Sequence, residues 1–199
     1  MKETKERIIL KALQYFVKND YQSVSLNSIA DSIGITKGGI YHYFDSKDDL
    51  FMECMITVFN LVGEFSAGMV NEDAGPKEVL ESLFSFENIF QVLSETLKMD
   101  FISNYMEYTY LLFVGMKKFP QISEMISSIY SEMQKSLESL FFYWQTNGVI
   151  KKEIDCRLIT FEIIAQIEGA MLVSGFTAGT DLSEVGKDLV ESTLKRISV

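Results

Sequence analysis

Apolar residues recur at steps of three and four along almost the whole chain, and this spacing constrains the fold most strongly. The first such stripe consists of Ile8, Ile9, Ala12, Leu13, Phe16 and Val17. Steps of three and four place side chains on one face of an α-helix. Only two prolines occur in 199 residues, and no stretch of useful length alternates as a strand would. The sequence therefore predicts an all-α fold.

Capping residues, glycines and prolines divide this pattern into successive helices. Ser25 and Thr36 are suited to N-caps, and Gly34 lies where a tight turn needs a positive φ angle. Pro76 and Pro120 suit the first turn of a helix. The expected helices cover about residues 4–19, 25–33, 36–44, 46–65, 76–118 with a break near Met99–Asp100, 120–146, 155–179 and 181–197.

Charge is distributed unevenly along the chain. The net charge is −10, yet residues 1–50 contain seven basic and seven acidic residues and are neutral. The remainder carries the whole acidic excess and would repel nucleic acid. Because non-specific attraction to phosphates would be modest, specific contacts at the neutral segment would supply a larger share of any DNA binding.

Several classes of protein do not fit the sequence. Cys54 and Cys156 are far apart and lack metal-ligand spacing, so we expect reduced thiols and no metal or other cofactor. The charged beginning has no apolar signal core, and the most apolar segments, 111–116 and 170–176, are too short to span a bilayer. We therefore expect a cytoplasmic protein with no membrane partner.

Residues 25–47 predict two short helices joined by a tight turn. Ile40 and Phe44 lie four apart and would pack inward, so the neighbouring side chains would face solvent. In a helix-turn-helix the second helix enters the DNA major groove, and hydroxyl, phenol, imidazole and ammonium groups suit phosphate oxygens. The DNA-binding candidates are Ser25, Thr36, Lys37, Gly38, Gly39, Tyr41, His42 and Lys47.

The glycine pair in the second of these helices is costly. Gly38 and Gly39 each cost about 1 kcal/mol relative to alanine inside a helix. A close approach of the backbone to DNA would explain that cost, and poor local optimisation is the alternative. Without a side chain at position 39, direct readout of bases would depend on Thr36 and on Lys37, whose ammonium can reach guanine acceptors.

This segment resembles the TetR family of bacterial one-component repressors. The matching residues are Ile29–Ala30, Gly34–Gly38, Tyr41–Phe44, Lys47 and Leu50–Phe51. The resemblance implies a dimer of subunits with about nine helices. It divides each subunit into a helix-turn-helix domain at residues 1–47 and a ligand-binding and dimerisation domain at 48–199. It also implies phosphate contacts by Tyr41, His42 and Lys47, and groove contacts around residues 36–39.

The body beyond residue 47 is rich in aromatic side chains. Aromatics at helical spacing usually fill a core, although a cavity between bundle helices is also a usual small-molecule site. The resemblance favours such a pocket, which we expect to take a hydrophobic, neutral or cationic effector. The candidate ligand-binding residues are Phe90, Tyr105, Tyr108, Phe113, Phe141, Trp144 and Gln166.

One helical segment, residues 169–176, is apolar on all sides. Such a helix must be covered all round, and its own subunit can cover one side while a partner subunit covers the other. Complete cover within one subunit is the alternative. The candidate residues of the dimer interface are Gly169, Ala170, Val173, Ser174, Phe176, Leu189 and Leu194.

Enzyme chemistry finds no support in the sequence. His42 is the only histidine, so the body has none for a serine or cysteine triad, and no glycine-rich phosphate loop follows a strand. We interpret the chain as a homodimeric, ligand-responsive transcriptional repressor that a small effector releases from a near-palindromic operator. The alternatives are a helical protein-interaction adaptor with a non-reading head, and a transcriptional activator of the same fold.

Overall fold

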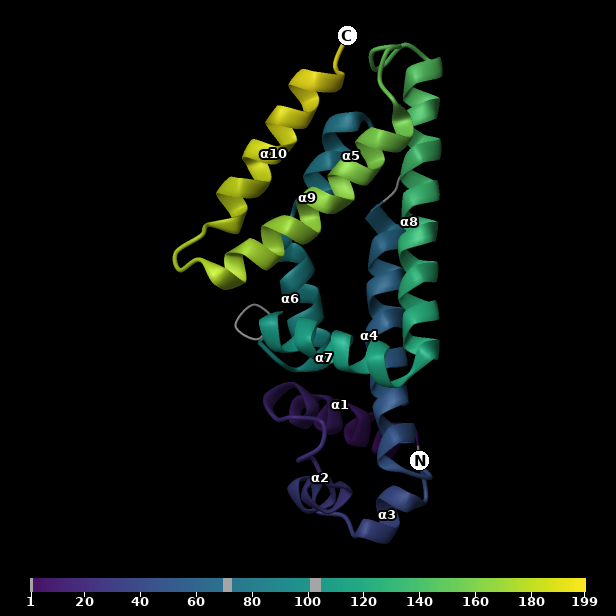
Figure 1. Ribbon diagram of the computed structural model, residues 1–199, viewed down its shortest axis with the longest axis vertical. Coiled ribbons are helices and arrows are strands. Elements are labelled where there is room, and N and C mark those ends of the chain that lie inside the picture. The colour runs from purple at the N-terminus through teal and green to yellow at the C-terminus, as the bar shows by residue number, and fades with distance from the viewer. Residues whose placement is uncertain (1, 70–72, 101–104) are drawn as a thin grey trace. The chain divides into compact units, whose positions relative to one another are not determined.

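The computed structural model describes residues 2–69, 73–100 and 105–199, which contain ten α-helices (Figure 1). The helices are α1 Lys2–Lys18, α2 Leu26–Ile33, α3 Lys37–Tyr41, α4 Lys47–Met69, α5 Pro76–Leu83, α6 Phe86–Leu97, α7 Tyr105–Lys118, α8 Pro120–Thr146, α9 Cys156–Phe176 and α10 Leu182–Ile197. Within the described residues the β pairing is limited to one isolated bridge between Ile150 and Ser198. The expected all-α fold is confirmed.

The expected capping residues start and end the helices of the amino-terminal part. The Oγ of Ser25 accepts a hydrogen bond from the Ser28 amide at 3.1 Å. Thr36 caps α3 in the same way, because its Oγ1 accepts from the Gly39 amide at 3.1 Å. Gly34 has a φ angle of +72°, the left-handed conformation that glycine adopts without strain.

The segment from Pro76 to Leu97 forms two helices where the sequence analysis expected one. Phe84 and Phe86 are both buried, with ring centres 6.3 Å apart. Residues two apart in a continuous helix point to opposite sides. The break after Leu83 therefore lets both rings enter the core. The expected break near Met99–Asp100 is confirmed, since α6 ends at Leu97 and Lys98 has a φ angle of 52°.

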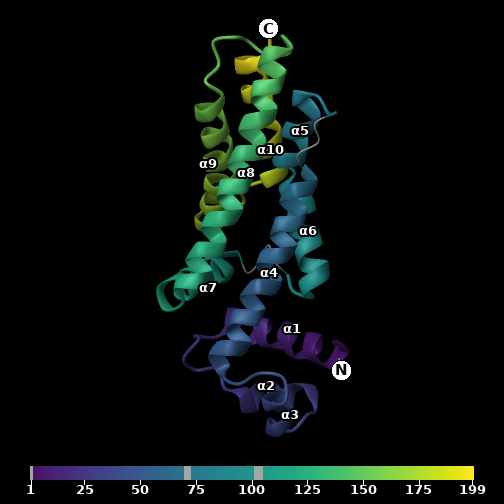
Figure 2. The same ribbon diagram turned by 90° about the vertical axis from the view of Figure 1, so that its right-hand side faces the viewer.

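The chain forms two compact units. Unit 1 consists of Met1–Val62 and Leu93–Ile126, and unit 2 of Gly63–Val92 and Ser127–Val199. In unit 1, α1 packs against α2 and α7, and α2 packs against α3. Figures 1 and 2 show that α2 and α3 lie on one side of α1 and that α7 lies on the other.

In unit 2, α10 packs against α5 and α9. Helix α10 comes close to the end of α5 at Gly186, where an added Cβ would lie 2.4 Å from the carbonyl oxygen of Phe84, the residue that follows α5. The backbone of Phe84 therefore leaves no room for a side chain at position 186. The core of this unit also contains Phe141 and Trp144, whose rings meet edge to face at 5.1 Å.

We expect Gly186→Ala to lower the free energy of unfolding by about 1–3 kcal/mol, the usual cost of overpacking a close-packed core. The added methyl group cannot be accommodated without moving α10 away from α5. Urea denaturation followed by circular dichroism at 222 nm measures the change.

Gly63→Ala is the matched control, because it makes the same change inside helix α4 where nothing lies within 4 Å of the added atom. Its helix propensity should raise the stability by up to about 1 kcal/mol. Equal destabilisation by both substitutions would contradict the assignment of Gly186 to a close helix contact.

Candidate nucleic-acid interface

The turn between α2 and α3 is closed by backbone hydrogen bonds. The Gly34 amide donates to the carbonyls of Ala30 and Asp31, and the Ile35 amide donates to Ala30 at 3.1 Å. Arg7 of α1 donates from Nη2 to the carbonyl of Ile33 at 3.2 Å. The orphan carbonyls at the end of α2 are thus satisfied, which fixes the direction in which the chain enters α3.

The inner side of α3 is held by two buried residues, as the sequence predicted. Ile40 and Phe44 are almost completely buried. The Nζ of Lys5 in α1 lies 5.5 Å from the centre of the Phe44 ring and forms an ion pair with Glu53 of α4 at 2.8 Å. Because α1 and α4 both contribute to this cluster, α3 rests on a base formed by two longer helices.

The outer side of α3 presents a mixed polar and aromatic surface. The exposed residues, which we call the α3 surface, are Thr36, Lys37, Gly38, Tyr41 and His42. Tyr41 is 46% exposed, and the Nζ of Lys37 lies 5.6 Å from the centre of its ring. Ammonium and phenol groups therefore share one side of the helix, where donors to bases or phosphates are needed.

Among the described residues, no contact requires glycine at positions 38 and 39. A Cβ added at Gly38 would lie 3.8 Å from Thr36 Oγ1, and one at Gly39 would lie 3.6 Å from the Cβ of Ile35. Both are ordinary van der Waals distances. The protein's own packing therefore does not account for the helix-propensity cost of the pair, which favours a reason outside the molecule, such as the close approach of another backbone.

The structure gives the ammonium of Lys47 internal partners. Its Nζ donates to the carbonyls of Tyr21, Gln22 and Val24 at 2.9, 3.3 and 3.0 Å. A lysine ammonium has three donors. All three are used to hold the segment that precedes α2, so a phosphate contact by this ammonium would require one of these bonds to break.

Ser25 likewise acts as a cap in the structure. Its hydroxyl is exposed and lies 3.0 Å from the hydroxyl of Ser28. A contact of Ser25 with DNA remains a prediction.

Comparison with known proteins identifies this arrangement. Residues 8–54, which include α2, α3 and the first turns of α4, match the family model described as bacterial regulatory proteins, tetR family. Residues 8–54 of this chain are therefore a DNA-binding domain of the TetR type. The match supports a DNA-binding transcriptional regulator, a class of protein that is not enzymatic, over the adaptor alternative.

Similar proteins cover nearly the whole chain. The Staphylococcus aureus biofilm operon icaADBC negative transcriptional regulator IcaR is 26% identical over 195 residues, 96% of each chain. A putative transcriptional regulator from Saccharomonospora viridis, solved in complex with choline, has a TM-score of 0.77 at 17% identity and full coverage of both chains. FadR from Bacillus subtilis in complex with stearoyl-CoA has a TM-score of 0.65 at 20% identity, covering 94% of this chain and 96% of FadR. The fold of this chain is therefore found in solved structures.

The candidate ligand-binding residues occur in both units of the regulator. Unit 1 contains Tyr105, Tyr108 and Phe113, and unit 2 contains Phe90, Phe141, Trp144 and Gln166. Phe113 lies on the surface, whereas Tyr108 is buried and donates from its hydroxyl to the sulfur of Met99 at 3.0 Å. Burial raises the pKa of Tyr108, so its hydroxyl stays protonated.

One candidate, Gln166 of α9, shows an unusual polar atom. Its Oε1 is buried and accepts no hydrogen bond within the part of the chain that the structure describes. Burying an amide oxygen without a partner costs about 1–3 kcal/mol. A polar atom in this condition marks a place where a bound molecule or a water would be favourable.

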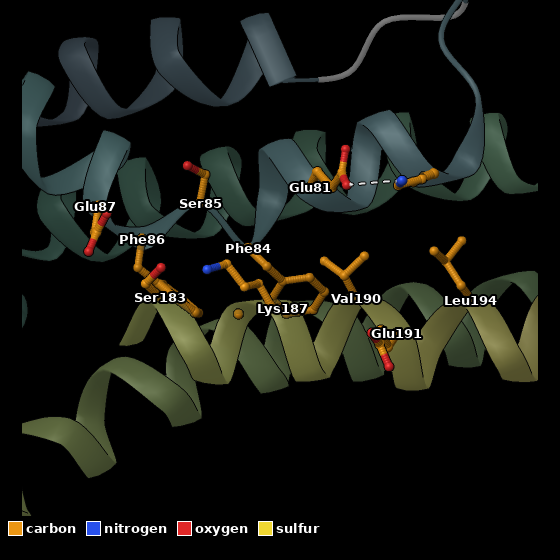
Figure 3. A pocket seen from close by; sticks show the side chains of 12 residues that line it. Glu81, Phe84, Ser85, Phe86, Glu87, Ser183, Lys187, Val190, Glu191 and Leu194 are labelled. Atoms are coloured by element: carbon orange, nitrogen blue, oxygen red, sulfur yellow. Dashed lines mark ion pairs between the residues drawn. The ribbon is translucent and has the colours of Figure 1, made fainter. Parts of the chain in front are cut away.

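Unit 2 also carries an open groove of about 600 Å³ between α5 and α10 (Figure 3). Its lining has charges of both signs, among them Lys77, Glu81 and Lys187, and apolar floor residues such as Phe84 and Val190, which lie between the two helices in Figure 3. The floor residues are already buried by their neighbours. Since a ligand would therefore cover little additional apolar surface, we do not assign the effector site to this groove.

Leu194 lies in the same groove. Figure 3 shows its side chain pointing toward α5, and α10 packs on α5 in the same unit. The expected position of Leu194 at a dimer interface stays a prediction. The exposed residues of α10 are mostly charged or polar, whereas its buried side consists of Gly186, Val190, Thr193 and Ile197.

Helix α9 leaves an apolar face uncovered. Large apolar side chains are exposed along it at Leu158, Phe161, Leu172, Val173 and Phe176, and three other interface candidates, Gly169, Ala170 and Ser174, are half-buried. By length and composition alone α9 would also suffice to cross a membrane. Glu162 and Glu168 lie in its middle and bond to Arg196 and Tyr130 of the same unit. Because charged groups are costly inside a bilayer, protein is the better cover for α9.

Sequence reasoning missed three residues that meet in unit 1. Tyr21, Asp48 and Lys118 form a hydrogen-bonded group. Asp48 lies in the first turn of its helix and Lys118 in the last turn of another, positions that complement the helix dipole. No local signal connects two residues that are 70 positions apart.

We expect Lys47→Met to lower the free energy of unfolding by about 1–3 kcal/mol, because the carbonyls of residues 21, 22 and 24 lose their charged donor. Urea denaturation measures the loss.

Lys37→Met removes the same charge from the same region but breaks no hydrogen bond to any described residue, so its cost should stay below about 1 kcal/mol. If the two variants were equally stable, the internal role of Lys47 would be refuted.

Proposed function

We propose that this regulator is a homodimeric repressor that binds a near-palindromic operator through the α3 surface and leaves it when a small effector binds the helical body. The observation that carries the proposal is the outward set of hydroxyl, ammonium and phenol groups on α3, held in place by buried Ile40 and Phe44. Repression is supported by the similarity to IcaR, a negative transcriptional regulator.

The exposed groups suit distinct roles on DNA. Thr36 and Lys37 stand at the start of α3, the end of a recognition helix that contacts base edges. Tyr41 and His42, near the other end, provide phenol and imidazole donors for phosphates. Gly38 and Gly39 keep the surface between them free of side chains, so the backbone can approach the groove closely.

A dimer is supported by the exposed apolar face of α9. Val173 and Phe176 project from it, and half-buried Gly169, Ala170 and Ser174 would let a partner helix come close. Leu189 of α10 is half-buried and would extend this face. A twofold dimer would place two α3 helices about 34–36 Å apart, one turn of DNA. Leu194 is left out of the proposed interface because it faces α5.

An effector site in the body is supported by the unpartnered Oε1 of Gln166 amid apolar residues. Two structural neighbours were solved in complex with choline, a small cation, and with stearoyl-CoA, which has a long apolar acyl chain, so proteins of this fold hold cationic and apolar ligands. We propose a mainly hydrophobic effector that changes operator affinity by a coupling of about 1–3 kcal/mol.

A regulator of this kind works where the DNA is, in the cytoplasm. A reporter gene distinguishes repression from activation, because deletion of the regulator raises expression only in the first case.

We expect Tyr41→Ala to weaken operator binding at least about tenfold, since it removes a phosphate donor and contact area from the α3 surface. Gel-shift titration with fragments from upstream of the regulator's own gene, followed by selection from genomic fragments, measures the affinity across a salt series.

Tyr110→Ala is the matched control. Tyr110 is 57% exposed, as Tyr41 is 46% exposed, but it belongs to α7. The control should bind as the wild type does. Equal affinity of all three proteins for the selected fragment would show that α3 is not the reading surface.

We expect Phe176→Asp to convert the proposed dimer to a monomer at micromolar concentration, because a carboxylate in an apolar interface would be buried without a partner. Sedimentation velocity measures the mass. Phe113→Asp, on a side chain 63% exposed against 69% for Phe176, is the control and should remain dimeric. A monomeric wild type would refute the proposed dimer.

A further inference from the structure

Lys118, the last residue of α7, bonds to two residues next to the candidate DNA-binding helices. Its Nζ lies 2.7 Å from Asp48 Oδ1 and 3.0 Å from the hydroxyl of Tyr21. The Tyr21 hydroxyl donates to the same carboxylate oxygen. Asp48 belongs to the first turn of α4, and Tyr21 to the segment between α1 and α2. Three separate parts of unit 1 therefore meet at one carboxylate.

The ring of Tyr21 is fixed from several sides. It stacks on Phe16 at 5.5 Å and meets Phe51 edge to face at 5.0 Å. The ammonium groups of Lys118 and Lys47 lie 4.3 and 4.5 Å from its centre, within the range of a cation–π interaction. Lys47 also donates a hydrogen bond to the backbone carbonyl of Tyr21. Tyr21, in the segment between α1 and α2, is therefore bound through its backbone, its ring and its hydroxyl.

The end of α7 is seated against α4 by shape as well as by charge. A Cβ added at Gly115 would lie 2.9 Å from Ile122 Cδ1 and 3.4 Å from Phe51 Cε1. Phe119, next to Lys118, stacks on Phe51 with ring centres 5.5 Å apart. The close packing leaves α7 little freedom to slide along α4. It therefore fixes the position of the Lys118 ammonium.

The ion pair is too exposed to be explained by stability alone. The side chains of Lys118 and Asp48 are 34% and 49% exposed, and pairs of this kind contribute little to folding. Hydrogen bonds from Lys118 and Tyr21 nevertheless hold the pKa of the Asp48 carboxyl below its ordinary value, so the group is charged at neutral pH. A weakly stabilising but specific connection is suited to setting position.

We infer that Lys118 is a positioning residue for DNA binding, which ties the end of α7 to Asp48 and Tyr21 and thereby sets the segment before α2 and the start of α4 relative to each other. The inference rests on the proposed function, because the position that it sets is the one from which α3 meets DNA. It gives the regulator a residue that controls operator affinity without contacting the operator.

The competing role for Lys118 is direct contact with a DNA phosphate. The variant Asp48→Asn distinguishes this role from positioning, because the two roles predict changes in operator affinity of opposite direction. Removing a carboxylate near DNA lowers repulsion and frees the ammonium, so direct contact predicts tighter binding. Positioning predicts that Asp48→Asn and Lys118→Met each weaken binding about three- to tenfold. The double variant should be no weaker than the worse single variant, because both remove the same connection.

The controls use the neighbouring lysine and the conservative replacement. Lys117 has no hydrogen bond or ion pair within the described residues, so Lys117→Met should change affinity less than about twofold. Lys118→Arg keeps the charge and should retain most of the affinity. Thermal unfolding should be nearly the same for all variants, which a role in folding alone would not allow.

Amide hydrogen exchange on the DNA-free protein provides a readout that does not depend on an operator. Peptides covering residues 19–25 and 45–50 should exchange faster in Asp48→Asn and Lys118→Met than in the wild type or Lys117→Met. Unchanged exchange, tighter binding by Asp48→Asn, or additive losses in the double variant would each overturn the inference. A wild type that selects no DNA fragment would instead refute the proposed function, while the exchange data would still decide the role of Lys118.

Discussion

A helix of five residues is not stable in water by itself, and α3 is such a helix. Its outward groups have defined positions only because other parts of unit 1 supply what the helix lacks. Thr36 caps its start, Ile40 and Phe44 anchor it to the core, and Lys47 holds the chain before α2. The arrangement of the α3 surface therefore depends on other parts of unit 1, the unit to which α7 also belongs.

Much of this arrangement is readable from the sequence because it depends on neighbours in the chain. The caps at Ser25 and Thr36, the left-handed Gly34 and the helix Pro120–Thr146 follow local rules of propensity and capping. The inward direction of Ile40 and Phe44 follows from helical spacing. The general fold and the location of the candidate DNA-binding site could thus be predicted, and the family match agrees with them.

The remaining features depend on residues that meet only after folding. The break between Phe84 and Phe86 exists because α10 approaches at Gly186 and both rings are buried, neither of which periodicity records. From the sequence alone Lys47 is predicted to face solvent. In the folded protein its ammonium donates hydrogen bonds to three backbone carbonyls that precede it in the chain. Asp48 and Lys118 each satisfy a helix dipole, so nothing in either local sequence points to a partner.

The bare backbone at Gly38 and Gly39 has a consequence for how such a protein changes its target. Added methyl groups would meet only ordinary contacts, and the neighbours Thr36, Lys37 and Tyr41 also point away from the core. Substitutions along this strip leave the buried framework unaltered. Under the proposed function, exchanging a few of these outward residues would change the operator preference while the buried framework stays the same, so target choice could diverge during evolution without refolding the domain.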